Sequence, residues 1–307
     1  MMDFNDFCKK TVIEMGRRNV TGSVQITNVV KNNQTKYTGM VISDGKSNIS
    51  PTLYLEKYYK KFIDGESFDE VENNIWKDYL NAKPKSSMDI SGFVEWGQAK
   101  NSVFLKVINY EKNKEELVNM PHRRFWDLAV VYYYVFSFDK NGLANTVVRN
   151  EHMKIWNVSE EELFFEACDN YKKQLPVTIR NIEDVLMTIL NENTQEKCDN
   201  QIKESMPIFI ASNVASVFGA TVILFPEELK PLADKYKSDL IILPSSIHEI
   251  LLLPDDADDM KLNDYLKMVS EVNQSQLRSE EILSYSVYRY KWKEEKIECV
   301  LESVGNK

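Results

Sequence analysis

The sequence predicts an α+β protein of two domains, each with a mostly antiparallel sheet against which helices pack. First, the chain has 307 residues and 43% of them are hydrophobic, enough for about two cores at roughly 150 residues each. Second, strand-like and helix-like patterns are grouped in runs instead of alternating singly. Third, residues 191–204 are polar and acidic without apolar periodicity, which predicts a linker between an N-terminal domain over residues 1–203 and a C-terminal domain over residues 204–307.

The N-terminal domain is predicted to begin with a helix followed by a hairpin. Apolar residues from Phe4 to Met15 recur every three or four positions, so they form one stripe of a helix that we expect to end near Gly16. Residues 24–30 alternate in polarity, and residues 34–42 are rich in β-branched and aromatic side chains. The Asn32-Asn33 pair supplies the turn between these two strands.

Two helices are predicted next. Ser50-Pro51 favours a helix start, because serine caps free amides and proline fits the first helical position, and Gly65 is predicted to end this helix. A second amphipathic helix carries apolar residues from Phe68 to Tyr79, and residues 83–87 form a polar surface loop.

Strands are predicted for much of residues 103–148. Residues 103–107 alternate, residues 126–138 form an almost continuous apolar strand, and the loop at residues 139–142 reverses the chain into a strand over residues 143–148. The apolar part, Leu128 to Phe138, is about half as long as a membrane-spanning helix, so we predict a buried strand.

Helices close the N-terminal domain, and strands dominate the C-terminal one. Ser159 with Glu162 forms the capping box of one helix, and residues 182–190 form another. In the C-terminal domain we predict, in order, strands at Ile208–Ala211 and Ala220–Phe225, a helix at Glu227–Tyr236, strands at Leu240–Leu243 and Ile247–Leu253, a helix at Met260–Val272, and a strand at Tyr285–Trp292 with a hairpin return at Lys293–Lys296.

Composition narrows the classes of function. The net charge of -9 makes binding to nucleic-acid backbones or anionic membranes unexpected as a main role. The N-terminus has no secretory pattern and the cysteines show no C-x-x-C spacing, so we expect reduced thiols in the cytoplasm and no metal site. No glycine-rich phosphate loop is present, and no cofactor is predicted. The four cysteines are Cys8, Cys168, Cys198 and Cys299.

Four stretches carry a resemblance to a known family: Asn48–Leu55, Asp127–Tyr132, Leu243–Glu249 and Glu271–Asn273. In order and spacing they resemble, across nearly the whole chain, a bacterial family known only as a domain of unknown function and found mainly in Gram-positive gut bacteria. Residues 244–249 are also similar to the end of a second uncharacterised bacterial family. The resemblance implies a bacterial cytosolic protein, and it implies no activity, cofactor or catalytic residue.

One segment offers the residue types of nucleophilic catalysis, because Ser245, Ser246, His248 and Glu249 stand within five positions. A hydrolase would use Ser246 as nucleophile and His248 as base. In a strand these two side chains share a face and that of Glu249 does not, so the acid of a triad would have to come from elsewhere. There is also no G-x-S-x-G elbow in the sequence.

The same segment has two other interpretations. In the first, Pro244-Ser245-Ser246 is a turn whose hydroxyls satisfy backbone groups, with His248 and Glu249 hydrogen-bonded at the mouth of a strand. In the second, Ser245, Ser246 and His248 contact a ligand or a partner beside the apolar strand that follows.

A basic cluster, His122-Arg123-Arg124, precedes the long apolar strand. It could bind an anion through bidentate arginine contacts, although surface ion pairs explain it as well. His152 is interpreted as a surface or capping residue.

Two further patterns have structural explanations. The acidic run Asp255–Asp259 lacks the spaced frame of a calcium loop and is explained by capping of the following helix. The aromatic residues at positions 132–134 and 285–292 are predicted to pack in the core and between domains, or to form a protein interface if they are exposed.

The sequence therefore favours a non-catalytic module that binds a small ligand, a partner protein or a second copy of itself. A hydrolase using Ser246 and His248 is the alternative. Neither nucleic acid nor a membrane is an expected partner.

Overall fold

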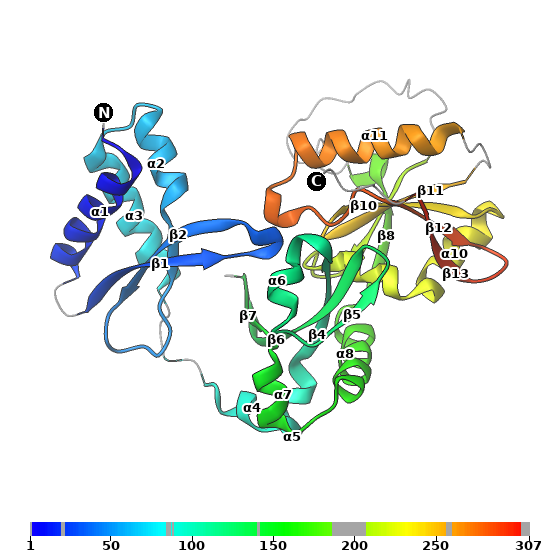
Figure 1. Cartoon of the computed structure of the whole chain (residues 1–307), viewed down its shortest axis with the longest axis horizontal. Coiled ribbons are helices and arrows are strands. Elements are labelled where there is room, and N and C mark those ends of the chain that lie inside the picture. Colours follow the sequence, from blue (N-terminus) through cyan, green and yellow to red (C-terminus); the bar gives the residue numbers. More distant parts are fainter. Residues whose placement is uncertain are drawn as a thin grey trace. The chain divides into compact units, whose positions relative to one another are not determined.

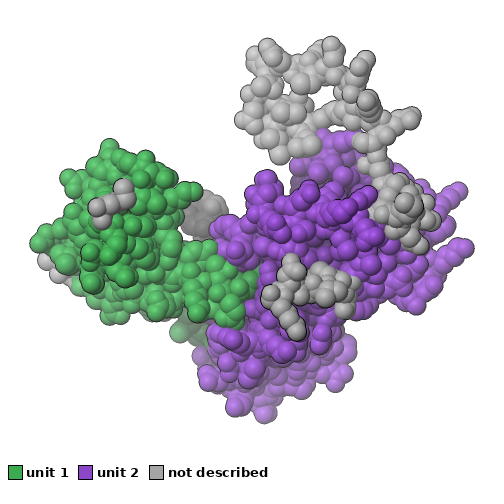
Figure 2. Space-filling view, turned by 45° about the horizontal axis from the view of Figure 1, so that its top comes forward, with its two compact units in different colours: residues 1–93, 136–144 green, residues 94–135, 145–307 purple. Residues whose placement is uncertain are grey.

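The fold is α+β and contains two compact units, which are coloured separately in Figure 2. A computed structural model describes residues 2–19, 22–83, 87, 89–139, 142–185, 207–255 and 260–301. Unit 1 comprises residues 1–93 with 136–144, and unit 2 comprises residues 94–135 with 145–307.

Unit 1 is a three-stranded antiparallel sheet with three helices. Strands β1 and β2 form a hairpin in which Ser23 lies opposite Ser43, and β3 adds to the other edge of β2. The elements are α1 (Phe4–Arg18), β1 (Ser23–Val30), η1 (Asn32–Gln34), β2 (Lys36–Ser43), β3 (Thr52–Tyr54), α2 (Leu55–Ile63) and α3 (Phe68–Ala82). A short helix, α4 (Ser91–Val94), spans the change from unit 1 to unit 2.

The core of unit 1 follows from the helical stripes in the sequence. Phe7 and Met15 of α1, Leu55 of α2 and Ile75 of α3 have at most 1% of their surface exposed, and they pack in one cluster with β2. Burying such side chains contributes about 1.5–3 kcal/mol each, which is what holds the helices to the sheet.

The first part of unit 2 contains most of a four-stranded sheet in the order β4-β6-β5, with β7 paired to β6. Strand β6 is central, and residues 128–134 within it are at most 7% exposed. The elements are α5 (Trp96–Ala99), η2 (Lys100–Ser102), β4 (Val103–Asn109), η3 (Glu111–Asn113), α6 (Lys114–Leu117), β5 (His122–Phe125), β6 (Leu128–Asp139), β7 (Gly142–Val147), α7 (Asn150–Trp156) and α8 (Glu160–Gln174).

The rest of unit 2 is a six-stranded, fully antiparallel sheet in the order β13-β12-β10-β11-β9-β8. Helix α11 lies across one face of this sheet (Figure 1), where Leu262 and Val269 pack on Ile241 and Leu253. The elements are β8 (Val177–Asn181), β9 (Phe209–Asn213), η4 (Gly219–Leu224), α10 (Pro226–Tyr236), β10 (Leu240–Ser246), β11 (Glu249–Pro254), α11 (Met260–Ser275), η5 (Ser279–Glu281), β12 (Val287–Lys291) and β13 (Lys296–Leu301).

Several local predictions are confirmed. The Ser159 hydroxyl accepts from the Glu162 amide at 3.2 Å while the Glu162 carboxylate accepts from the Ser159 amide at 3.0 Å, which is the predicted capping box. The His152 ring accepts from the Arg149 amide at 3.1 Å, as a capping residue does. The hairpin of residues 24–42 and the buried strand from Leu128 also form as predicted.

The predicted helix start at Ser50-Pro51 is wrong. Residues 52–54 form β3, which pairs with residues 39–41 of β2, and α2 begins only at Leu55. The gain from pairing with β2 therefore outweighs a favourable local capping sequence. Similarly, α1 continues two residues beyond Gly16, whose exposed position inside the helix has only the usual cost of about 1 kcal/mol.

The predicted strand at Ala220–Phe225 is also wrong, because residues 219–224 form the 3₁₀ helix η4. The Thr221 hydroxyl donates to the Phe218 carbonyl at 2.8 Å and helps to close the first turn. Short apolar runs are compatible with a buried helix as well as with a strand, and periodicity alone does not separate them.

The two compact units do not coincide with the predicted division at residue 203. Strand β8 precedes the predicted linker, β9 follows it, and the two pair from Val177 opposite Asn213 to Asn181 opposite Phe209. One sheet therefore includes chain from both sides of residue 203, and the change of unit falls near residue 93. The linker at 191–204 and the end of the predicted helix at 182–190 lie outside the described residues.

Among the described residues, no helix is both long enough and apolar enough to cross a membrane.

Candidate functional site

The polar segment Ser245–Glu249 forms the end of β10, a turn, and the start of β11. Ser246 lies opposite Glu249 in the hairpin, after a register shift that begins at Leu243. The Ser246 hydroxyl is buried and accepts a hydrogen bond from the His248 amide at 3.0 Å. The backbone of Ser245 lies in β10, and its side chain lies outside the described part of the structure.

The His248 ring is fixed by the loop that precedes η4. Its Nδ1 accepts from the Phe218 amide at 3.3 Å, so the proton of the neutral ring is on Nε2. The ring stacks on Phe218, with centroids 5.7 Å apart and planes 15° apart, and the His248 carbonyl accepts from the Ser212 hydroxyl at 2.8 Å. Three contacts therefore hold this histidine in one orientation.

Backbone conformation explains how the loop reaches the histidine. Ser216 and Phe218 have φ values of 52° and 53°, in the left-handed region that bulky residues rarely adopt. A Cβ on Gly219 would lie 2.0 Å from the Ser212 hydroxyl and 2.5 Å from the His248 carbonyl oxygen. Only glycine fits there, because the backbone of η4 approaches the turn so closely.

Burial favours the neutral forms of the His248 and Glu249 side chains in this turn. It lowers the pKa of His248, and the charges of Lys106 and Arg278 lower it further, while Glu281 opposes them. Burial also raises the pKa of Glu249. A neutral His248 is consistent with its role as acceptor from the Phe218 amide.

This geometry does not join a nucleophile to a base. Ser246 and His248 are neighbours, but the Ser246 hydroxyl bonds to backbone, and the Nδ1 of His248 faces a backbone amide. Within the described residues, no hydrogen bond links the imidazole to Ser246 Oγ or to the Glu249 carboxylate, as a catalytic triad requires. The contacts are those of the turn in which hydroxyls satisfy backbone groups.

The basic cluster of β5 is largely engaged within the protein. Arg123 Nε donates to both carboxylate oxygens of Glu160, at 2.8 and 3.0 Å. Arg124 Nε donates to the Trp126 carbonyl at 2.9 Å, and His122 Nδ1 lies 2.9 Å from a backbone carbonyl oxygen. An anion bound by Arg123 would have to compete with Glu160.

The acidic run is only partly described. Asp255 forms an ion pair with Arg289, with Oδ2 and Nε 2.6 Å apart, and residues 256–259 lie outside the described part of the chain. In the part that is described, no group of three histidine, cysteine, aspartate or glutamate side chains is placed to hold a metal ion.

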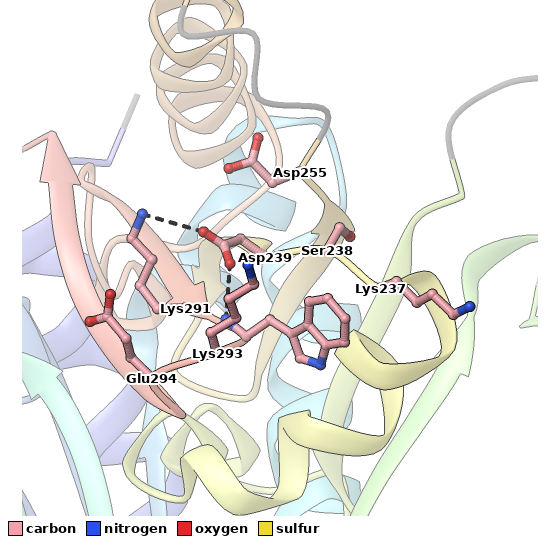
Figure 3. Close-up of a pocket in the computed structure, with 8 residues that line it drawn as sticks. Lys237, Ser238, Asp239, Asp255, Lys291, Lys293 and Glu294 are labelled. Carbon is pink, nitrogen blue, oxygen red and sulfur yellow. Dashed lines mark hydrogen bonds and ion pairs between the residues drawn. The ribbon is translucent and has the colours of Figure 1, made fainter.

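A cavity that the sequence did not indicate lies at one end of the six-stranded sheet, where β10 begins and β11 and β12 end (Figure 3). Its volume is 510 Å³, within the range of ligand pockets. The residues that line it are Lys237, Ser238, Asp239, Asp255, Lys291, Trp292, Lys293 and Glu294. We refer to it as the Asp239 cavity.

Asp239 holds the wall of this cavity together. Its carboxylate accepts from the Trp292 amide at 2.9 Å and pairs with the Lys291 ammonium at 3.3 Å, as the dashed lines in Figure 3 show. Its carbonyl accepts from the Asp255 amide at 2.8 Å. One residue thus joins the start of β10 to the ends of β11 and β12.

The acids of the Asp239 cavity all have cationic partners. Asp239 pairs with Lys291, Asp255 pairs with Arg289, and Glu294 pairs with Lys296, with Oε2 and Nζ 2.6 Å apart.

Three donors at the same wall have no partner among the described residues. Lys237 and Lys293 are exposed and form no ion pair with any described residue, and Lys237 points away from Asp239 in Figure 3. The Ser238 hydroxyl oxygen is buried and has no hydrogen-bond partner. The indole NH of Trp292 is used, since it donates to Asp234 at 2.7 Å.

A second polar cluster, also missed by the sequence analysis, surrounds Asp127. The Asp127 carboxylate accepts from the Ser284 hydroxyl at 2.5 Å, from the Ser286 hydroxyl at 3.0 Å, and from the Tyr288 hydroxyl. Both serines and Tyr288 have no exposed surface. Burial, with the nearby Asp127 charge, raises the pKa of Tyr288. We call these four residues the Asp127 cluster.

Sequence patterns gave partial signals for these two sites. Asp127 stands in a stretch that carries the family resemblance, and residues 285–292 are predicted as an aromatic core strand, but nothing in the sequence pairs them across more than 150 positions. The cavity residues lie in turns, where charged side chains are common.

The comparisons with known proteins place the chain in a family. The family of unknown function DUF5688 matches residues 2–292, and the chain belongs to it. Neither the curated proteins nor the solved structures gave a match.

Proposed function

We propose that this protein is a non-catalytic binding module that takes a small polar ligand in the Asp239 cavity. The observation that carries the proposal is the cavity itself, with a ligand-sized volume of 510 Å³ and donors that the protein leaves unused. Ligand sites in proteins are concave and hold a few convergent polar groups, and this cavity has both features.

The wall of the cavity is suited to binding because it is fixed before a ligand arrives. Asp239 anchors the ends of β11 and β12 through two backbone amides, those of Asp255 and Trp292. A ligand that meets a preorganised wall loses less free energy to ordering of the protein.

The turn at Ser246 and His248 supports a binding role over a hydrolase. Its hydroxyl and imidazole already bond to backbone groups, and activating the hydroxyl would require breaking those bonds.

We place the protein in the cytoplasm of a bacterium. The bacterial source rests on the family resemblance, and the cytoplasm on the thiols, because Cys8, Cys168 and Cys299 are free and an oxidising compartment favours disulfides.

A thermal-shift screen of small polar metabolites tests the binding proposal. We expect at least one compound to raise the melting temperature with a saturable dose dependence, since a ligand that binds only the native state stabilises it by mass action. The shift should disappear in Lys293→Glu, which reverses a charge at the cavity, and remain in Lys77→Glu, which makes the same change on an exposed face of α3. A shift that both variants keep would contradict the proposal.

Turnover of 4-nitrophenyl acetate, compared between the full chain and Ser246→Ala, tests the catalytic alternative. We expect no turnover above the rate without protein. Turnover that the substitution abolishes would favour the hydrolase.

A further inference from the structure

Among the described residues, two lysines at the Asp239 cavity have no acidic partner. Each of its three acids already has a cationic partner among the described residues, whereas Lys237 and Lys293 have no acidic one. A cationic ligand would have to displace a lysine or an arginine from an existing pair. An anionic ligand would meet the Lys293 ammonium in the cavity, with that of Lys237 at the rim, and would break no ion pair among the described residues.

A hydroxyl in the same wall points to the same chemistry. Ser238 Oγ is buried and has no hydrogen-bond partner, and such a group is normally satisfied in a folded protein. Its proton can be donated to an anionic oxygen, which accepts stronger hydrogen bonds than a neutral oxygen does.

We propose that the ligand of the Asp239 cavity carries an oxyanion, a carboxylate or a phosphate, that binds the ammonium of Lys293 and, once the Ser238 side chain has turned toward the cavity, the hydroxyl of Ser238. This inference rests on the proposed binding function. Lys237, at the rim and directed away from Asp239, adds attraction at a distance, which salt weakens (Figure 3). Trp292 offers a flat apolar surface in the same cavity for the uncharged part of the ligand.

Four probes that share a phenyl ring and differ in charge test the inference on the full chain. Isothermal titration calorimetry at fixed ionic strength compares phenyl phosphate and benzoate with neutral benzyl alcohol and cationic benzylammonium. We expect both anions to bind about tenfold more tightly than the other two probes. The tighter of the two anions identifies the phosphate or the carboxylate class.

Variants then locate the binding. The double variant Lys237→Gln with Lys293→Gln should weaken anion binding about tenfold. The control, Lys46→Gln with Lys77→Gln, removes the same charge from two exposed lysines of unit 1 and should change binding less than about twofold. An equal loss in both double variants would show that net charge alone attracts the anion, which would overturn the site.

The variant Ser238→Ala separates a binding role of the hydroxyl from a structural one, because the melting temperature and the affinity for the anion are measured on the same protein. Because the hydroxyl makes no hydrogen bond in the free protein, its removal should leave the melting temperature unchanged and weaken anion binding about fivefold. Unchanged affinity would overturn the role of Ser238.

The proposed function and this inference can fail separately. Tight binding of benzyl alcohol or benzylammonium in the cavity would overturn the inference that the ligand carries an oxyanion, and it would support the proposed binding function. An absence of binding by all four probes, together with a thermal-shift screen without hits, would overturn both.

Discussion

Two aspartates of unit 2 organise polar clusters in opposite ways. Asp127 is surrounded by neutral hydroxyl donors on fully buried residues, and every donor is directed at its carboxylate. Asp239 is held by a backbone amide and a half-buried lysine, at the edge of an open cavity. Both residues connect distant segments, but only the second leaves donors unused.

The difference shows how to separate a structural cluster from a candidate site. A closed cluster in which each group is satisfied has no capacity for a ligand, and its function is to hold the fold. A cluster with a buried hydroxyl lacking a partner and two lysines lacking acids has capacity left, which a ligand can use.

The largest effect is expected for Asp127→Ala. The substitution removes the acceptor of three hydroxyls and leaves them buried, so we expect the free energy of unfolding to fall by about 3 kcal/mol. Urea denaturation of the purified variant measures this fall. Asp264→Ala, on an exposed position of α11, is the control and should change it by less than about 0.5 kcal/mol. If Asp127→Ala lowered the free energy of unfolding as little as Asp264→Ala, the Asp127 cluster would not be a stabilising cluster that differs from the Asp239 cavity.

Asp239→Ala should lower the free energy of unfolding by less, about 1.5 kcal/mol. It removes the hydrogen bond from the Trp292 amide and one half-buried ion pair. The same urea titration gives the value. If the loss equalled that of Asp127→Ala, the cavity wall would be as much a structural element as the closed cluster.

Alkaline pH should act on the Asp127 cluster through the phenol of Tyr288. The raised pKa of Tyr288 means that the folded state favours the neutral phenol, so this stability is present below about pH 10, the ordinary tyrosine value, and is lost as the pH rises above it. One such group contributes a slope of about 1.4 kcal/mol per pH unit. Between pH 9 and 11 the melting temperature of Tyr288→Phe should fall less steeply than that of the wild type, whereas Ser238→Ala, which removes no titrating group from the cavity wall, should keep the wild-type slope. Equal slopes in Tyr288→Phe and wild type would argue against a buried Tyr288 phenol.

A pair of serine substitutions gives the smallest effects and the sharpest contrast. Ser284→Ala loses the bond to Asp127 and the bond from the Ser286 amide, so we expect a loss of about 1 kcal/mol. Ser238→Ala loses no bond and should change stability by less than about 0.5 kcal/mol. Chemical denaturation of both variants measures the two changes in the free energy of unfolding. Equal losses would contradict the distinction between the Asp127 cluster and the Asp239 cavity.

Local patterns were enough to predict much of the fold. Helical stripes, the Ser159 capping box and the Asn32-Asn33 turn are decided within a few residues, and they formed where the sequence indicated. Errors came where a distant segment decided the outcome. Thr52–Tyr54 is a strand because β2 offers it a partner, and residues 219–224 are helical where they meet the His248 turn.

The candidate site was less predictable than the fold. The sequence places Ser246, His248 and Glu249 in one segment, but it could not show that the Ser246 hydroxyl and the Nδ1 of His248 both bond to backbone amides. The Asp239 cavity requires the ends of three strands to meet, and spacing along the chain does not encode that meeting.

The Asp127 cluster also has a consequence for the order of folding. The six strands of the large sheet mostly pair with strands close in sequence, so the sheet can grow as the chain is synthesised. The hydroxyls of Ser284, Ser286 and Tyr288 lie 157 to 161 positions after Asp127, so this cluster closes only after the chain has been synthesised through Tyr288. We therefore expect it to form after the folding transition state, and its loss to accelerate unfolding while leaving the folding rate almost unchanged.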